Sequence, residues 1–366
     1  MPIRILHIVS FMQRGGLETL IMNCYRNIDR EKMQFDFIVH RDFRADYDDE
    51  IEALGGRIYR LPRLNPFSPG YKKALLDFFQ SHPEYRIVHC HLDCMSALPL
   101  AAAKKCGVPV RIAHGHSSNQ DKDWKYLLKR IWMKKIPAVA THFFACSKEA
   151  GEWMFPGQQV TVVNNGIDTD RFAYSPDVRA EVREELGLDR ELVLGHAGRF
   201  VPVKNHDFLV DVFAEVHRRR PDSRLLLMGT GPLEEQTRQK VSQLGLDNAV
   251  QFLGVRSDVN RILQAVDVFA LPSRNEGLGM AAVEAQAAGL PCVVSDAVPR
   301  LCDMSGSVTF LPLGDSPAQW AEQVLQGSGL PRVSRTEQIA AAGFDIQTTA
   351  DWLRDFYLNE VFKDVQ

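Results

Sequence analysis

The sequence lacks any long hydrophobic run. No stretch approaches 18 consecutive apolar residues, the length that a membrane-spanning helix requires. The first ten residues are apolar but too few for the hydrophobic segment of a secretory signal, and the polar Arg14 follows soon after them. We therefore expect neither an export signal nor a membrane span.

Cysteine is also scarce, with seven in 366 residues. The number is odd and the positions are scattered, mostly inside apolar runs, as for reduced thiols that act as small core residues. This pattern excludes a disulfide scaffold and predicts a cytoplasmic location.

The sequence has no large excess of either charge, and its content of glycine and proline is not high. Lysine and arginine total 43 against 46 acidic residues, a net charge of −3, so no overall positive field draws the chain to nucleic acid. With 45% hydrophobic residues and only 25 glycines and 19 prolines, the chain is neither disordered nor of low complexity. At roughly 150 residues per domain, its length predicts two globular domains.

Short β-branched apolar runs alternate with amphipathic stretches in two successive series. Parallel strands joined by helices produce this alternation, so we predict an α/β fold of two tandem doubly wound, Rossmann-like domains. The expected strands are 3–9, 35–39, 86–91, 110–113 and 141–145, then 192–197, 224–228, 250–253, 266–271 and 291–295.

The boundary between the two domains is predicted near Asp168, after a turn sequence that contains Gly166. The first domain is then 1–168 and the second 169–347. Residues 348–366 carry a final helical pattern, which either caps the second domain or crosses back to complete the first.

The stretch 271–285, LPSRNEGLGMAAVEA, carries the most chemical information. A strand ends there, a polar loop follows, and a helix begins, so the N–H groups of Gly277, Leu278 and Gly279 are candidates to bind an anion such as phosphate. Glu276 and Glu284 lie eight residues apart, which is at most about 12 Å on one helix. That span suits a sugar nucleotide held by its sugar and ribose hydroxyls. The plainer alternative is that Glu276 is a helix-cap residue and Glu284 a solvated position on the helix.

A second basic group follows the first strand of the second domain. Arg199 and Lys204 lie in the sequence GRFVPVKN, where a guanidinium fork and an ammonium group can converge on a diphosphate and neutralise a departing one. Lys204 is otherwise a solvated residue at a helix start. A diphosphate neutralised in this way needs no metal ion.

Residues 271–285, followed by AAGLPCVV at 287–294, resemble the retaining glycosyltransferases of the GT-B fold, of the family 4 type found in bacterial polysaccharide biosynthesis. The two glutamates of that signature are Glu276 and Glu284. The resemblance implies two Rossmann-like domains facing across a cleft, a donor sugar on Glu276, a ribose on Glu284, and a phosphate clamp of Arg199 and Lys204.

Three further positions resemble sites of that family. Gly15 and Gly16 correspond to a glycine-rich loop of the N-terminal domain, and they lack the G-x-G-x-x-G spacing of a dinucleotide-binding enzyme. His114, at a strand end, corresponds to a histidine beside the donor sugar, although His116 is the alternative. The base is expected near 254–256, which includes Arg256.

The sequence HCHLDC at 89–94 superficially resembles a zinc site. Alternation along a strand places His89 and His91 on one face and Cys90 on the other, and no second ligand pair follows. We therefore expect no metal and no cofactor.

The segment 124–136 carries an apolar stripe flanked by lysine and arginine. Such a helix either packs in a core or lies on an anionic membrane surface. Because many relatives use lipid-linked acceptors, we consider peripheral contact with the inner face of the membrane.

The combined prediction is a metal-independent glycosyltransferase that moves a hexose from a nucleotide-diphosphate donor, with UDP the expected nucleotide, to a glycan or polyprenyl-diphosphate-linked acceptor with retention. Retention follows from the resemblance. The alternatives are a sugar-nucleotide epimerase of the same fold, which needs further acid and base groups, and a catalytically inactive carbohydrate-binding protein.

Overall fold

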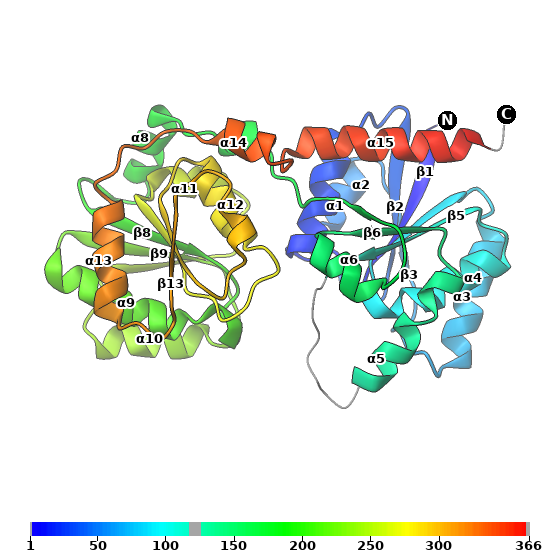
Figure 1. Cartoon of the computed structure of the whole chain (residues 1–366), viewed down its shortest axis with the longest axis horizontal. Helices are drawn as coiled ribbons and strands as arrows, with labels where there is room; N and C mark the ends of the chain where they lie inside the picture. Colours follow the sequence, from blue (N-terminus) through cyan, green and yellow to red (C-terminus); the bar gives the residue numbers. More distant parts are fainter. Residues whose placement is uncertain (1, 117–125, 364–366) are drawn as a thin grey trace. The chain divides into compact units, whose positions relative to one another are not determined.

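The computed structural model describes residues 2–116 and 126–363, and the chain forms two compact α/β units (Figure 1). Unit 1 comprises Met1–Ile167 together with Gly343–Gln366, and unit 2 comprises Asp168–Ala342. The chain therefore leaves unit 1, builds unit 2 without interruption, and returns. The second unit ends five residues before the limit of 347 that the sequence suggested.

Unit 1 contains a seven-stranded parallel sheet of order β3-β2-β1-β4-β5-β6-β7. Helices cover both faces, and each face has its own hydrophobic core. Strand β2 is buried at every residue, as expected for a parallel strand covered on both sides. The strands are β1 (Ile3–Ile8), β2 (Met33–Val39), β3 (Ile58–Arg60), β4 (Ile87–Cys90), β5 (Val110–Gly115), β6 (His142–Ala145) and β7 (Val160–Val162). The helices are α1 (Gly16–Asn27), α2 (Asp48–Ala53), α3 (Pro69–Ser81), η1 (Asp93–Ser96), α4 (Ala97–Lys105), α5 (Tyr126–Met133), η2 (Ile136–Ala138), α6 (Lys148–Met154) and α15 (Ile346–Phe362).

Unit 2 contains a six-stranded parallel sheet of order β10-β9-β8-β11-β12-β13, again with a core on each face. The strands are β8 (Leu192–Ala197), β9 (Ser223–Met228), β10 (Val250–Gly254), β11 (Val268–Leu271), β12 (Cys292–Ser295) and β13 (Val308–Leu311). The helices are α7 (Thr169–Phe172), α8 (Pro176–Glu185), η3 (Pro202–Lys204), α9 (His206–Arg219), α10 (Glu234–Gln243), α11 (Val259–Ala265), α12 (Met280–Ala287), η4 (Arg300–Cys302), α13 (Pro317–Gly327) and α14 (Thr336–Ala341).

These sheets confirm the prediction of two doubly wound α/β units. All ten predicted strands are present, and the structure adds β3, β7 and β13. The three added strands lie at sheet edges, have three or four residues each, and are only partly buried. Because one side of an edge strand has no partner strand, the sequence there carries no continuous apolar run.

Several helices begin at a Ser-Pro pair, which explains their position in the chain. In α3, α8 and α13 a serine immediately precedes the helix, and its hydroxyl accepts a hydrogen bond from a backbone N–H of the first turn. Proline follows as the first helical residue, where its missing N–H costs nothing. The three pairs are Ser68-Pro69, Ser175-Pro176 and Ser316-Pro317.

The C-terminal helix α15 belongs to unit 1, where it lies against α1 (Figure 1, red). Ile346, Leu353 and Tyr357 are buried in the same core as β1 and β2. The segment that leaves unit 1 and the segment that returns to it are hydrogen-bonded to each other. Ile167 N–H donates to Phe344 C=O (2.8 Å), and Ile346 N–H donates to Ile167 C=O (2.9 Å). A side chain at Gly166 would lie 2.9 Å from the Ile346 Cα, so this close approach requires glycine.

Candidate active site

In unit 2, the loops that follow β8 and β11 meet at the carboxyl edge of the sheet. These two strands are neighbours, although β9 and β10 separate them in sequence, so the strand order reverses between them. Ligands of open α/β sheets bind at such a switch point. The structure brings two predicted site residues together here: Lys204 Nζ lies 2.5 Å from Glu276 Oε1. Their side chains are 21% and 13% exposed, so the pair is largely buried but can still be reached.

One backbone and one side-chain hydrogen bond connect the two loops. Arg274 N–H donates to Val203 C=O (2.7 Å), and Arg274 Nη2 donates to Asn205 Oδ1 (3.1 Å). Asn205 adopts a left-handed conformation with φ of 58°, which lets it end η3 and begin α9. Because Val203 and Asn205 are both bonded to Arg274, the backbone of Lys204 between them is held close to the loop that carries Glu276.

The loop after Glu276 contains backbone donors that have no partner among the described residues. Within residues 2–116 and 126–363, the N–H groups of Gly277, Leu278 and Gly279 have no hydrogen-bond acceptor. Gly279 has φ of 86° and precedes α12, and the space around Gly277 is open for 4 Å where a side chain would start. The arrangement can bind an anion such as phosphate. Glu276 itself lies in this loop outside the helix, so the separation estimated along one helix does not apply.

Glu284 lies on α12, partly buried. Burial raises the pKa of its carboxyl group to about 7, and the charge of Arg171 on α7 opposes this rise. At neutral pH the group is therefore divided between its charged and neutral forms. Either form can hydrogen-bond to hydroxyl groups, but the carboxylate offers two charged acceptor oxygens, whereas the neutral acid uses one of its oxygens as an O–H donor.

The two predicted arginines are placed differently from Lys204. Arg199 is exposed in the loop after β8, and its guanidinium has no partner in the described part of the chain. Arg256, after β10, is also exposed, and it donates to both carboxylate oxygens of Asp258 (2.8 and 2.7 Å). Arg199 is thus free to bind a ligand, whereas Arg256 is occupied by Asp258.

Two buried histidines, His196 and His206, lie near Lys204, and they were not predicted from the sequence. His196 Nδ1 bonds to Ala270 C=O (2.8 Å), and its ring lies 4.7 Å from that of His206. Burial, aided by the Lys204 charge, lowers the pKa of His206 to about 4, and burial likewise holds the pKa of His196 well below its ordinary value. Both rings are therefore neutral at pH 7. Their positions in the sequence, near the end of β8 and just after η3, could have indicated that they lie close to Lys204.

In unit 1, five histidines converge at the carboxyl edge of the sheet, where β1 and β4 mark the reversal of strand order. His114, on β5, is 2% exposed, and its Nδ1 lies 3.0 Å from His89 Nε2. His116 Nε2 lies 3.0 Å from His91 Nδ1, and His91 Nε2 lies 3.1 Å from His7 Nδ1. Four of these histidines, His89, His91, His114 and His116, are evident in the sequence, but His7 and the convergence of all five rings follow from the order of three adjacent strands.

This histidine cluster bears on the predicted absence of metal. His89 and His91 do share a face, with ring centroids 4.2 Å apart, while Cys90 packs in the opposite core. Two triads have potential ligand atoms within 4.8 Å of one another: His7, His89 and His91, and His91, His114 and His116. Imidazole is a common zinc ligand, so metal independence stays a prediction.

Gly15 and Gly16 lie at the start of α1, after β1. Helix α1 begins at Gly16, and Thr19 N–H donates to Gly15 C=O (2.9 Å). A side chain on Gly15 would collide with the Glu18 carboxylate, whereas the space beside Gly16 is open. Because that carboxylate is the end of a flexible side chain that can move aside, packing does not require glycine at position 15, and both Gly15 and Gly16 stay candidates for ligand contact.

The basic apolar segment is only partly described. Trp124 and Lys125 lie outside the described residues, and α5 begins at Tyr126. Trp132 packs against the core of unit 1 with Lys135 Nζ 4.2 Å from its ring centre, while Ile131 is 45% exposed. Among the described residues, no helix has both the length and the apolar character required to cross a membrane.

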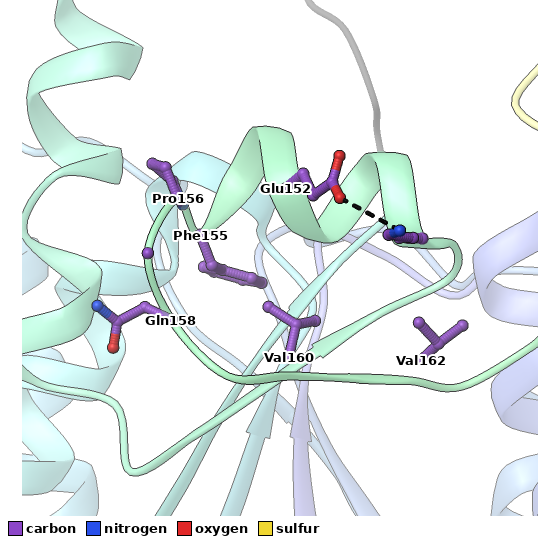
Figure 2. A pocket seen from close by; sticks show the side chains of 8 residues that line it. Glu152, Phe155, Pro156, Gln158, Val160 and Val162 are labelled. Carbon is purple, nitrogen blue, oxygen red and sulfur yellow. Dashed lines mark ion pairs between the residues drawn. The ribbon is translucent and has the colours of Figure 1, made fainter.

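None of the predicted site residues lines the surface pocket of unit 1 that Figure 2 shows. Phe155, Val160 and Val162 form its apolar wall, and Lys148 and Glu152 pair across its rim at 3.8 Å. It lies beside α6 and the edge strand β7. None of the chemistry described above involves this pocket.

Comparisons with known proteins identify the family and the fold of the chain. Residues 14–171 match the family described as "Glycosyltransferase Family 4", and residues 191–327 match "Glycosyl transferases group 1". The chain is 34% identical over 375 residues to "Putative glycosyltransferase EpsF" of Bacillus subtilis (strain 168), covering 99% of this chain and 98% of EpsF. It is 29% identical to an Escherichia coli enzyme, UDP-Gal:alpha-D-GlcNAc-diphosphoundecaprenol alpha-1,3-galactosyltransferase, over 79% of this chain and 80% of that one.

Solved structures of other proteins share the fold. The crystal structure of Anabaena Alr3699/HepE in complex with UDP-glucose superposes with a TM-score of 0.80 at 20% identity, covering 97% of this chain and 99% of that one. The named relatives are transferases, which does not favour the epimerase alternative. The chain therefore belongs to glycosyltransferase family 4, and it is a glycosyltransferase with the GT-B fold of two Rossmann-like domains.

Proposed function

We propose that this glycosyltransferase moves a hexose from a nucleotide-diphosphate donor, UDP being the favoured nucleotide, to a hydroxyl group of a glycan or lipid-linked acceptor, with retention at the anomeric carbon. The observation that carries this proposal is the contact between Lys204 and Glu276 beside three free backbone N–H groups. A cation and an amide cluster suit a diphosphate, and an adjacent carboxylate suits sugar hydroxyls.

Each group has a distinct proposed role. The N–H groups of 277–279, Lys204 and Arg199 hold the diphosphate and stabilise the charge that develops as it leaves. Glu276 accepts hydrogen bonds from the donor sugar, and Glu284 accepts them from the ribose. His114 contacts a substrate oxygen, and Gly16 leaves room for a ligand at the start of α1.

The transfer needs no covalent intermediate on the protein. The bond from the anomeric carbon to the diphosphate oxygen breaks, and the acceptor oxygen bonds to that carbon on the same face. The departing phosphate oxygen takes the acceptor proton, so the donor supplies its own base. Lys204 and Arg199 lower the energy of this step by neutralising the leaving group, and we propose that no metal ion takes part.

The donor and acceptor classes rest on the relatives. The Escherichia coli relative is named for a UDP-galactose donor and a diphosphoundecaprenol acceptor, and the HepE structure contains UDP-glucose. A lipid-linked acceptor would place the enzyme at the cytoplasmic face of a membrane. The segment 124–136, with the exposed Ile131 on α5, is the proposed membrane contact.

A donor screen tests this function. We expect the purified chain to transfer sugar from a UDP-sugar, in a panel that includes GDP-mannose, to lipid-linked or free glycans in the presence of EDTA. Mass spectrometry identifies the product, and NMR reports its anomeric configuration. Transfer that EDTA abolishes and a divalent cation restores would contradict metal independence. If no nucleotide sugar in the panel binds or reacts, the proposed function is wrong.

Glu284 predicts a pH dependence of donor binding. With a pKa of about 7, the carboxylate fraction rises from about one tenth at pH 6 to nine tenths at pH 8. Because the carboxylate is the better acceptor for ribose hydroxyls, we expect donor affinity, measured by calorimetry, to increase severalfold over this range.

The matched variant is Glu284→Gln, in which affinity should vary little between pH 6 and pH 8. Stability provides a second measurement. Because the folded pKa lies above the ordinary value of 4.5, the folded state holds its proton longer, and the free energy of unfolding falls as pH rises from about 4.5 through 7. Glu284→Gln should therefore raise the melting temperature at pH 8 more than at pH 5. If donor affinity in the unmodified protein does not change between pH 6 and pH 8, the assignment of Glu284 to the ribose is wrong.

A further inference from the structure

A hydrogen-bonded chain connects the C-terminal helix to His114. Tyr357 on α15 is fully buried, and its hydroxyl lies 2.6 Å from Nδ1 of His89 on β4. His89 Nε2 lies 3.0 Å from Nδ1 of His114 on β5. The remaining nitrogen, His114 Nε2, is buried and has no partner among the described residues. The chain thus ends at a ring nitrogen that none of the described residues contacts by a hydrogen bond.

The proton positions in this chain follow from its members. Burial holds the pKa of both His89 and His114 well below the ordinary value, so each ring is neutral and carries one proton. Within the described residues the Tyr357 hydroxyl has this single hydrogen bond, and it can use its own proton only by donating to His89 Nδ1. His89 then carries its proton on Nε2 and donates to His114 Nδ1. His114 must in turn carry its proton on Nε2.

We propose that Tyr357 is a positioning residue that acts through His89 to hold His114 as a neutral hydrogen-bond donor at Nε2. The substrate partner is an oxygen acceptor, such as a sugar hydroxyl or a phosphate oxygen. In this tautomer Nε2 has no lone pair to accept a proton, so His114 is not a general base. The inference rests on the proposed function, because it gives His114 a substrate to contact.

The neighbouring histidines provide an internal comparison. His7, His91 and His116 form a second chain, with distances of 3.1 and 3.0 Å, and its end atoms His7 Nε2 and His116 Nδ1 both lack a partner in the described chain. Within 2–116 and 126–363, no hydroxyl group bonds to either end atom, so the described residues do not fix the direction of this chain. The ring of His116 lies only 4.1 Å from that of His114, which places both chains in the same surroundings. Of the two chains, as far as the described residues show, the one that contains Tyr357 has a residue that selects one tautomer.

Nitrogen NMR of histidine-labelled protein tests the tautomer directly and needs no substrate. We expect His114 to be protonated at Nε2 in the unmodified protein and to become a mixture of both tautomers in Tyr357→Phe, while His7, His91 and His116 keep their signals. Tyr71→Phe is the matched control. It removes an equally buried bond from tyrosine to His40 Nε2 (2.8 Å), but His40 Nδ1 ends at the Val9 carbonyl (2.8 Å). This variant should leave His89 and His114 unchanged.

Kinetics then connect the tautomer to the reaction. Tyr357→Phe should lower kcat/KM about threefold to tenfold, as expected for one hydrogen bond lost in part of the population, and Tyr71→Phe should leave it unchanged. His114→Gln offers an amide donor at a similar position and has no tautomer to select. In a double-mutant cycle, Tyr357→Phe should therefore have little effect on kcat/KM in the His114→Gln protein.

The two experiments separate the outcomes. A proton on His114 Nδ1, or a tautomer that does not respond to Tyr357→Phe, overturns the proposal even if the enzyme transfers sugar. The expected tautomers in a protein that binds no nucleotide sugar overturn the proposed function and leave the proton positions intact. Metal analysis that finds zinc bound by His91, His114 and His116 in the purified protein also overturns the proposal, because those ring nitrogens would then be ligands.

Discussion

Replacing Lys204 with methionine is expected to lower turnover by about 10²–10³-fold, the effect of removing one preorganised group that stabilises a developing negative charge. Methionine retains most of the aliphatic volume and removes the ammonium group. Because Nζ lies 2.5 Å from Glu276 Oε1, the substitution also leaves a largely buried carboxylate without its cation. We expect a loss of about 1–3 kcal/mol in the free energy of unfolding. Steady-state kinetics and thermal unfolding measure the two effects.

The double variant Lys204→Met, Glu276→Gln distinguishes catalysis from folding. It removes both charges, so stability should return close to that of the unmodified protein, as when neither member of a buried pair stays charged. Turnover should not return, because the diphosphate still lacks its cation. Recovery of turnover together with stability would show that Lys204 only neutralises Glu276.

Replacing Glu276 with glutamine should lower kcat/KM by about 10–10²-fold, the size of a charge-assisted hydrogen bond to a sugar hydroxyl. Glutamine keeps the shape and one acceptor oxygen but loses the charge. The effect should differ between donors with different sugar stereochemistry, because Glu276 is proposed to contact the sugar. Kinetics with a panel of donors sharing one nucleotide measure that difference.

The charge-reversed pair Lys204→Glu, Glu276→Lys provides the control. An ion pair of the same composition can form, so unfolding should be nearly normal, while transfer should stay at the background level. The reversed carboxylate would face the diphosphate and the reversed ammonium group would face the sugar. Substantial activity in this variant would mean that the pair serves packing alone, and it would end the assignment of both residues.

The fold shows which features local sequence can specify. The central strands of both sheets are buried on both faces, so each required a run of apolar residues that is visible in the sequence. The edge strands β3, β7 and β13 required no such run and were missed. Helical periodicity at the C-terminus predicted α15, but it could not decide which domain the helix completes. The pairing of Ile167 with Asp345 and the burial of Leu353 and Tyr357 in unit 1 made that choice.

By itself, the sequence determined the two α/β units, the family and the loops that carry the chemistry, because a strand end, glycines and charged residues in one short stretch are local information. Only the tertiary structure decided which of those loops meet. Lys204 and Glu276 are 72 residues apart, and they touch because β11 crosses back to lie beside β8. Tyr357 and His89, 268 residues apart, meet because the C-terminal helix returns to the first unit. Contacts of this kind depend on sheet order and on where a helix packs, which are properties of the folded chain that no stretch of neighbouring residues encodes.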